Sequence, residues 1–187
     1  MAALDSLILY WSAGGNTRRV AEAAAEGLTA GGAQVALLSV TDGAAEQLDL
    51  SIYPLLGLAC PSYHFGPPAP MRRFVEQALR RQGVQPTAPT QPLRWGIAMV
   101  TYAGPHTGLR EATPAGDFLA QGLQHLGRQV RGEWYTVGAF HGDLDQPNNR
   151  IGLLGDIRHR PNEHDLGVIR SNALGLATAL RWELEAR

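Results

Sequence analysis

Five short runs of mainly apolar residues alternate along the chain with longer segments in which apolar residues recur every three or four positions. A continuous apolar run is typical of a strand that is buried on both faces, and the wider spacing is typical of an amphipathic helix. Strands that alternate with helices predict a parallel sheet covered on both faces, which is the α/β class. The predicted strands cover residues 7–11, 34–40, 55–60 and 95–102, with a fifth inside 129–140.

Local sequence signals mark where the intervening helices begin and end. A helix is predicted over residues 17–30, and the glycines at 31–32 end it because glycine accepts the left-handed backbone of a helix C-terminus. Thr113 followed by Pro114 predicts an N-cap with proline at the first helical position. The chain therefore carries helix boundaries at the places that the strand pattern requires.

The last helix is predicted to begin at Asn162, because Asp165 three residues later completes a variant of the capping box. Residues 82–91 are rich in Gly, Pro and Thr and are predicted to be a surface connection. Residues 141–160 are predicted to be a long polar loop, and loops of that length are usually functional. The length of 187 residues fits a single domain spanning residues 1–187.

Composition and charge exclude several classes of protein. All 16 basic residues of the chain are Arg. The net charge is only −1, so the chain has no overall positive electrostatic field that would attract nucleic acid. The single cysteine, Cys60, excludes an internal disulfide and any cysteine-based iron–sulfur or zinc cluster. No apolar run approaches 18 residues, so no membrane span is expected, and a cytoplasmic location follows by default.

The turn after the first strand, residues 12–17, carries the chemistry. Its sequence is Ser-Ala-Gly-Gly-Asn-Thr, and a helix-forming run follows at once. Such a turn places backbone N–H groups and the positive end of the helix dipole around a pocket that suits an anion such as phosphate. It is neither the G-x-G-x-x-G fingerprint nor a Walker A loop, since the spacing and the lysine are missing.

This turn resembles the Ser/Thr-x-Thr-Gly-Asn-Thr phosphate loop of the flavodoxin family. Gly14 departs from that pattern, because the family usually has Thr there, and one phosphate hydroxyl is missing. Residues 61–68 resemble the second flavin loop of the family, and residues 101–104 resemble the third. Residues 160–166 are similar to the Gly-Arg-Pro-Asn-Glu-x-Asp-Leu signature that precedes the last helix in many members.

The resemblance covers residues 4–180 and implies a three-layer, doubly wound flavodoxin-like sheet with five parallel strands in the order 2-1-3-4-5 and helices on both faces. This order is known for flavodoxin itself, and it places the ligand at the carboxyl ends of strands 1 and 3. A phosphate cradle there lies beside aromatic rings from two neighbouring loops, the arrangement that FMN needs. The expected cofactor-binding residues are Ser12, Ala13, Gly14, Gly15, Asn16, Thr17, Pro61, Ser62, Tyr63, His64, Phe65, Gly66, Thr101, Tyr102, Ala103 and Gly104.

Two functions with FMN and one without it follow as hypotheses. The favoured one is an oxidoreductase that transfers electrons from NAD(P)H to a quinone-like or other small acceptor. The first alternative is a flavodoxin-type one-electron shuttle between redox proteins, and the second is a flavin-free regulatory or interaction module. The enzyme is favoured because a positive rim suits an anionic substrate such as NADPH. The arginines that follow the cofactor loops are Arg18, Arg19, Arg72, Arg73 and Arg110.

Histidines give two further hypotheses. His64 and His106 follow the third and fourth predicted strands, and either is a candidate to protonate reduced flavin or an acceptor. No metal is expected, because the acidic and histidine residues between His141 and His164 fit no known ligand spacing. The sequence does not identify the electron acceptor, and it does not determine whether the protein forms a homo-oligomer.

Overall fold

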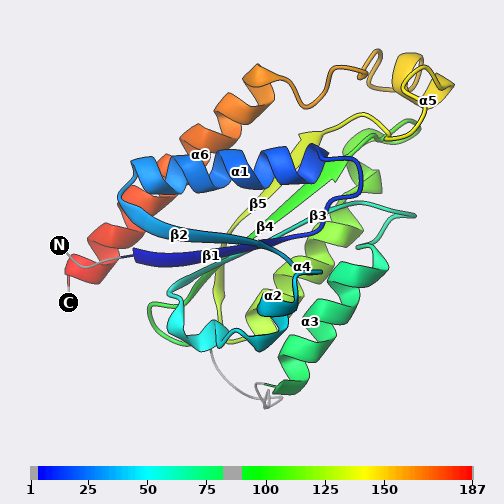
Figure 1. Ribbon diagram of the computed structural model, residues 1–187. Helices are drawn as coiled ribbons and strands as arrows, with labels where there is room; N and C mark the ends of the chain where they lie inside the picture. The colour runs from blue at the N-terminus through cyan, green and yellow to red at the C-terminus, as the bar shows by residue number, and fades with distance from the viewer. Residues whose placement is uncertain (1–3, 82–89, 187) are drawn as a thin grey trace.

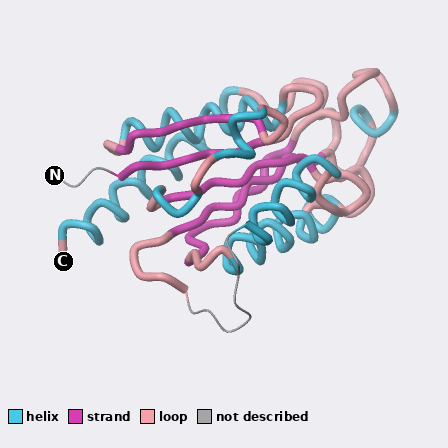
Figure 2. The backbone as a smooth tube through the Cα atoms, turned by 60° about the horizontal axis from the view of Figure 1, so that its bottom comes forward, coloured by secondary structure: helices cyan, strands magenta, loops and turns pink. Residues whose placement is uncertain are grey.

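The computed structural model describes residues 4–81 and 90–186, which form a five-stranded sheet between two layers of helices (Figures 1 and 2). The strands are β1 (Leu4–Tyr10), β2 (Ala33–Ser39), β3 (Leu55–Pro61), β4 (Trp95–Tyr102) and β5 (Gln129–Val137). All neighbouring strands of this sheet are parallel, and their order is β2-β1-β3-β4-β5. The predicted fold class and strand order are confirmed.

Each face of the sheet carries its own apolar core. The helices are α1 (Asn16–Ala30), α2 (Gly43–Gln47), α3 (Ala69–Arg81), α4 (Thr113–His125), α5 (Pro147–Arg150) and α6 (Glu163–Glu185). Helices α1 and α6 cover one face, and α2, α3 and α4 lie on the other (Figure 1). Ile8 of β1 packs toward α1 and α6, while its neighbour Leu9 packs toward α3 and α4. Burial on both faces explains why β1 is a continuous apolar run.

Most predicted element ends lie within a few residues of the observed ones. The predicted helix over 17–30 begins one residue earlier, at Asn16, and Gly32 after it has φ +87°. The predicted polar loop 141–160 contains the single turn α5. Most of the predicted connection 82–91 lies outside the described residues. Across residues 4–81 and 90–186, no helix combines the length and the apolar character needed to cross a membrane.

The prediction that Thr113 caps α4 is wrong. Thr113 is itself the first helical residue, and the N-cap is Ala112, which makes no side-chain cap hydrogen bond. A 3₁₀ turn over Gly108–Glu111 runs straight into the helix, and the N–H of Ala112 donates to the carbonyl oxygen of Leu109 at 2.9 Å. Because the chain is already helical at this point, there is no extended residue whose side chain would cap it.

A buried cation fastens the amino-terminal edge of the sheet. Arg128 is 2% exposed and lies just before β5. Its guanidinium donates to the carbonyl oxygens of Leu50, Tyr53, Pro54 and Trp95. Burial lowers the pKa of Arg128 to about 10, so the side chain is still charged at neutral pH. One side chain thereby supplies donors to the segments that lead into both β3 and β4.

We expect Arg128→Ala to lower the free energy of unfolding by about 2–4 kcal/mol, because it leaves several buried carbonyl oxygens without a donor. Urea denaturation of the two proteins measures this difference. Arg73→Ala on the exposed side of α3 is the control, with an expected change within about 0.5 kcal/mol. Equal effects of the two substitutions would contradict the role assigned to Arg128.

Candidate functional site

The segment between β1 and α1 forms an open cradle of backbone N–H groups. Gly15 is the N-cap residue of α1 and has φ +91°, a left-handed conformation that glycine adopts without strain. Its N–H donates to Oγ of Ser12 at 3.0 Å. Among the residues that the structure describes, no side chain caps the first turn of α1, and that turn holds no acidic residue. Its N–H groups are therefore available to an anion, which the helix dipole also favours.

Two polar side chains hold this cradle against neighbouring strands. Thr17 is buried, and its Oγ1 lies 2.7 Å from Oγ1 of Thr101 near the end of β4. Nδ2 of Asn16 donates to the carbonyl oxygen of Ala139, just after β5, at 2.8 Å. Both residues were expected to bind the cofactor. In the structure, their side chains fix the position of the backbone that lines the cradle.

A tight turn after β3 forms a second wall. The N–H of Tyr63 donates to the carbonyl oxygen of Gly66 at 2.8 Å, and the N–H of Gly66 donates back at 3.0 Å. Between them, His64 and Phe65 have φ of 47° and 64°. Two consecutive left-handed residues are what a type I′ turn requires, and residues with a side chain adopt that conformation at a cost.

The loop after β4, residues 101–104, is the third wall of the site. A fourth segment, residues 138–141 directly after β5, was missing from the sequence prediction. The N–H of Phe140 donates to Oδ1 of the buried Asn149 at 2.7 Å, and Nδ2 of Asn149 donates to the carbonyl oxygen of Phe140 at 3.1 Å. The N–H of Ala139 donates to the carbonyl oxygen of Arg160 at 2.9 Å. One signal was available: this segment leaves the same edge of the sheet as the other loops and carries two rings, Phe140 and His141.

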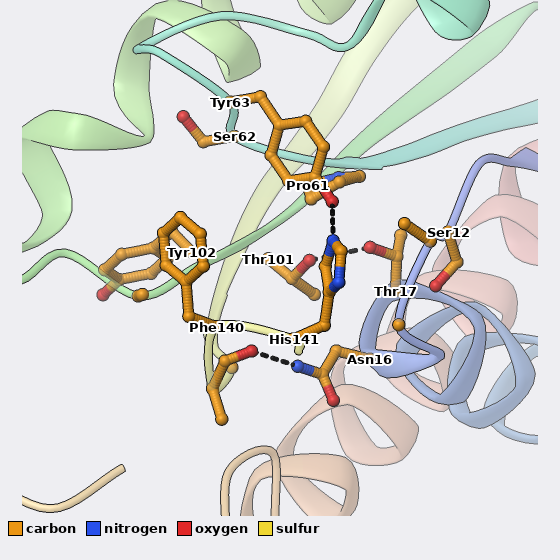
Figure 3. Close-up of a pocket in the computed structure, with 15 residues that line it drawn as sticks. Ser12, Asn16, Thr17, Pro61, Ser62, Tyr63, Thr101, Tyr102, Phe140 and His141 are labelled. Atoms are coloured by element: carbon orange, nitrogen blue, oxygen red, sulfur yellow. Dashed lines mark hydrogen bonds between the residues drawn. The ribbon is translucent and has the colours of Figure 1, made fainter. Parts of the chain in front are cut away.

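Together the four segments enclose a hollow at the carboxyl ends of the strands (Figure 3). Its narrow end, beside the cradle, has a volume of about 40 Å³. Its wide end, among Tyr63, Tyr102 and Phe140, has a volume of about 330 Å³. A water molecule needs roughly 10–15 Å³, so the narrow end has room for a small polar group. The narrow end fits a phosphate monoester, and the wide end fits a flat ring.

Most of the predicted cofactor residues line this hollow. Those at the narrow end are Ser12, Ala13, Gly14, Asn16, Thr17, Pro61, Ser62, Tyr63, Thr101, Tyr102 and Ala103. His64, Phe65 and Gly104 line the wide end, while Gly15 and Gly66 belong to the turns that shape it. His106 is exposed and is not among the lining residues. A proton-donating role for His64 or His106 stays a prediction, and His64 is the one that faces the hollow.

The rings at the hollow contact one another. Nε2 of His141 lies 2.6 Å from the hydroxyl oxygen of Tyr63 (Figure 3). Trp11 meets the Tyr63 ring edge to face, with ring centroids 5.7 Å apart. Burial raises the pKa of Tyr63 and of Tyr102, so both hydroxyls stay protonated at neutral pH. In the part of the chain that the structure describes, no three His, Cys, Asp or Glu side chains gather where they could hold a metal ion.

Arg160, whose carbonyl oxygen accepts from Ala139 in the segment after β5, is itself held by an ion pair. Arg160 donates two hydrogen bonds to the carboxylate of Asp165. Asp165 also completes the predicted capping box, since it accepts from the N–H of Asn162 at 2.8 Å and donates its own N–H to Oδ1 of Asn162 at 3.1 Å. Burial raises the pKa of Asp165, but the hydrogen bonds from Arg160 and Asn162 outweigh it and leave that pKa below its ordinary value.

Comparison with known proteins agrees with this geometry. The family model for flavodoxin matches residues 8–147. Comparison with curated protein sequences gave no match. A flavodoxin from the domain Archaea superposes with a TM-score of 0.64 at 16% identity, over 95% of this chain and 99% of that one. A WrbA-like flavodoxin protein from Agrobacterium tumefaciens gives a TM-score of 0.63 at 14% identity, over 97% and 99% of the two chains.

A longer protein shares the fold as well. Rubredoxin oxygen:oxidoreductase from Desulfovibrio gigas gives a TM-score of 0.66 at 15% identity, and the match covers 97% of this chain but 37% of that one. At such identities the structural likeness shows the fold, whereas the family model covers most of the sequence. The chain therefore belongs to the flavodoxin family, whose members bind FMN. FMN-dependent electron transfer is the function that this family supports.

We expect Asp165→Asn to lower the free energy of unfolding by about 1–2 kcal/mol at pH 7, because the amide cannot make the charged contacts with Arg160. The folded-state pKa of Asp165 is depressed, so its contribution is present above the unfolded pKa near 3.8 and is lost as the pH falls through the folded value. Urea denaturation between about pH 7 and pH 3 should show the difference shrinking below about pH 4. A pH-independent difference would contradict the assignment to charge.

The combined substitution His64→Asn and Phe65→Gly is expected to stabilise the protein by about 1 kcal/mol. Asn and Gly adopt the left-handed backbone of a type I′ turn at lower cost, and Phe65, at 62% exposure, gives up little burial. Thermal unfolding followed by circular dichroism measures the gain in Tm. His106→Asn, outside the turn, is the control. A fall in Tm for the double variant would show that the two side chains themselves stabilise this loop.

Proposed function

We propose that the chain is an FMN-dependent oxidoreductase that takes electrons from NAD(P)H and passes them to a quinone-like or other small acceptor. The observation that carries this proposal is the make-up of the hollow: residues of the 12–17 cradle line its narrow end, and the rings of Tyr63, Tyr102 and Phe140 line both ends. The cradle over residues 12–17 would hold the phosphate, and Tyr63, Tyr102 and Phe140 would flank the ring. FMN, when bound, supplies the hydride and single-electron chemistry that the side chains lack.

The side chains at the wide end suit a ring that gains electrons. Each ring contact contributes about 0.5–1.5 kcal/mol beyond burial. Tyr63 and Tyr102 remain neutral, because burial raises their pKa values, so neither side chain places a negative charge at the hollow. A phenolate in either place would repel added electron density.

Apolar side chains at the mouth support a flat, apolar acceptor. Phe65 at the turn is 62% exposed, and Phe140 is 43% exposed. Phe65 and Phe140 line the wide end of the hollow. A quinone-like molecule would cover this apolar surface while it lies against the cofactor ring, and removing the surface from water favours its binding.

The predicted positive rim gives weaker support to NADPH than the sequence indicated. Nε of Arg18 lies 2.7 Å from the carboxylate of Glu22, and the guanidinium of Arg72 lies over the Phe118 ring at 5.1 Å. The remaining predicted rim residues are Arg19, Arg73 and Arg110, all exposed. The proposal therefore names NAD(P)H without a preference between the two nucleotides.

A one-electron shuttle between redox proteins is the second candidate. One observation favours it: the apolar mouth extends onto a broader surface. The N–H of Leu153 donates to the carbonyl oxygen of Pro105 at 2.7 Å, which places Leu153, 63% exposed, and Leu154, 37% exposed, beside the loop that follows β4. A surface of this breadth suits a protein partner as well as a small acceptor.

For either function, we propose that residues 1–187 form a single domain and that the protein is located in the cytoplasm.

The purified protein is expected to be yellow or to become so with added FMN, and NADPH or NADH should bleach its flavin absorbance under anaerobic conditions. Stopped-flow mixing measures the bleaching, with free FMN at the same concentration as the control. Benzoquinone should then restore the colour. Bleaching by dithionite but by neither nucleotide would favour the shuttle. A protein that takes up no FMN would overturn both functions.

A further inference from the structure

His141 occupies the space that a side chain at position 14 would need. A Cβ atom built on Gly14 would lie 2.3 Å from Cβ of His141 and 2.9 Å from its Cγ, far inside contact distance. Gly14 does not have a positive φ, so its backbone by itself accepts other residues. The neighbour that excludes a side chain there is therefore His141. Position 14 is also where the phosphate loop of this chain lacks a hydroxyl.

The backbone that carries His141 is held by three separate parts of the chain. Ala139 accepts from Nδ2 of Asn16 and donates to the carbonyl oxygen of Arg160. Phe140 exchanges two hydrogen bonds with Asn149. Since these contacts come from α1, the segment before α6, and α5, the place of His141 over the cradle is set by the fold. An exposed side chain that is positioned this firmly beside a ligand hollow calls for a chemical role.

The orientation of the imidazole points to that role. Nε2 is 2.6 Å from the Tyr63 hydroxyl, and Figure 3 shows the ring lying between Tyr63 and the cradle residues Ser12 and Thr17. In the tautomer in which Nε2 accepts from that hydroxyl, Nδ1 carries the hydrogen and is a donor. Nδ1 has no partner within residues 4–81 and 90–186.

We propose that His141 is a ligand of the FMN phosphate and supplies the donor that position 14 lacks. The inference rests on the proposed binding of FMN. The imidazole N–H would donate to a phosphate oxygen at the narrow end of the hollow, while the N–H groups of the cradle donate from the other side. Gly14 is then required because it makes room for this side chain. His141 and Gly14 therefore depend on each other: glycine at position 14 leaves space for the imidazole, and the imidazole supplies the donor that glycine lacks.

The test compares FMN with riboflavin, which has the same ring and no phosphate. His141→Ala is expected to weaken FMN binding by about 10- to 100-fold, the loss of one hydrogen bond to a charged group, and to leave riboflavin binding unchanged. Fluorescence titration measures both dissociation constants without any turnover. His125→Ala, an exposed histidine at the end of α4, is the matched control and should alter neither.

A second variant tests the pairing with Gly14. Gly14→Thr alone should weaken FMN binding, because the new side chain overlaps His141. Gly14→Thr combined with His141→Gly should bind FMN more tightly than His141→Gly alone, because glycine removes the Cβ atom that the threonine would overlap and the threonine hydroxyl replaces the lost donor. A double variant that binds FMN no better than His141→Gly would overturn the exchange of roles between the two positions.

The two proposals fail in different ways. If His141→Ala weakens FMN and riboflavin equally, His141 acts on the ring or on the fold, and its assignment to the phosphate is overturned while FMN binding stands. The same holds if His141→Ala changes neither constant. If the unaltered protein binds neither flavin, the proposed function itself is overturned, and this inference falls with it.

Discussion

The hydrogen bond from Nδ2 of Asn16 to the carbonyl oxygen of Ala139 joins residues 123 positions apart and determines how the site is closed. In the sheet order, β3 and β4 lie between the strands that these residues follow, so the bond spans the mouth above both. It requires close approach, because a Cβ atom on Gly138 would lie 3.0 Å from Nδ2 of Asn16. The bond thereby ties the segment that follows β1 to the segment that follows β5, and both segments line the hollow.

Polar contacts, rather than apolar packing, position the other parts of the site. The buried hydroxyls of Thr17 and Thr101 join α1 to β4, and Asn149, fully buried, binds both backbone groups of Phe140. Such contacts are directional, so they fix a loop in one place where apolar contacts would let it slide. The two apolar cores hold the layers together, and these few hydrogen bonds convert the resulting edge into a shaped pocket.

The sequence is sufficient for the features that depend on neighbouring residues. Continuous apolar runs located the strands, and the Asn162 capping box and the cradle over residues 12–17 were each readable within six positions. The segment 138–141 was not readable, because its place depends on partners far away in the chain and its surroundings have no periodic pattern. The prediction for Thr113 failed because a 3₁₀ turn over Gly108–Glu111 runs directly into the helix, and the Thr-Pro pair carries no signal for that turn.

Cys60, near the end of β3, is 0% exposed, and burial raises the pKa of its thiol. Electrophiles such as maleimides react with the thiolate of an accessible cysteine, and the chain contains no other cysteine. The folded protein should therefore be inert to these reagents. A cysteine introduced at the surface can then carry a fluorophore or a spin label with Cys60 left in place, and any slow labelling of Cys60 itself would report how often the sheet opens to solvent.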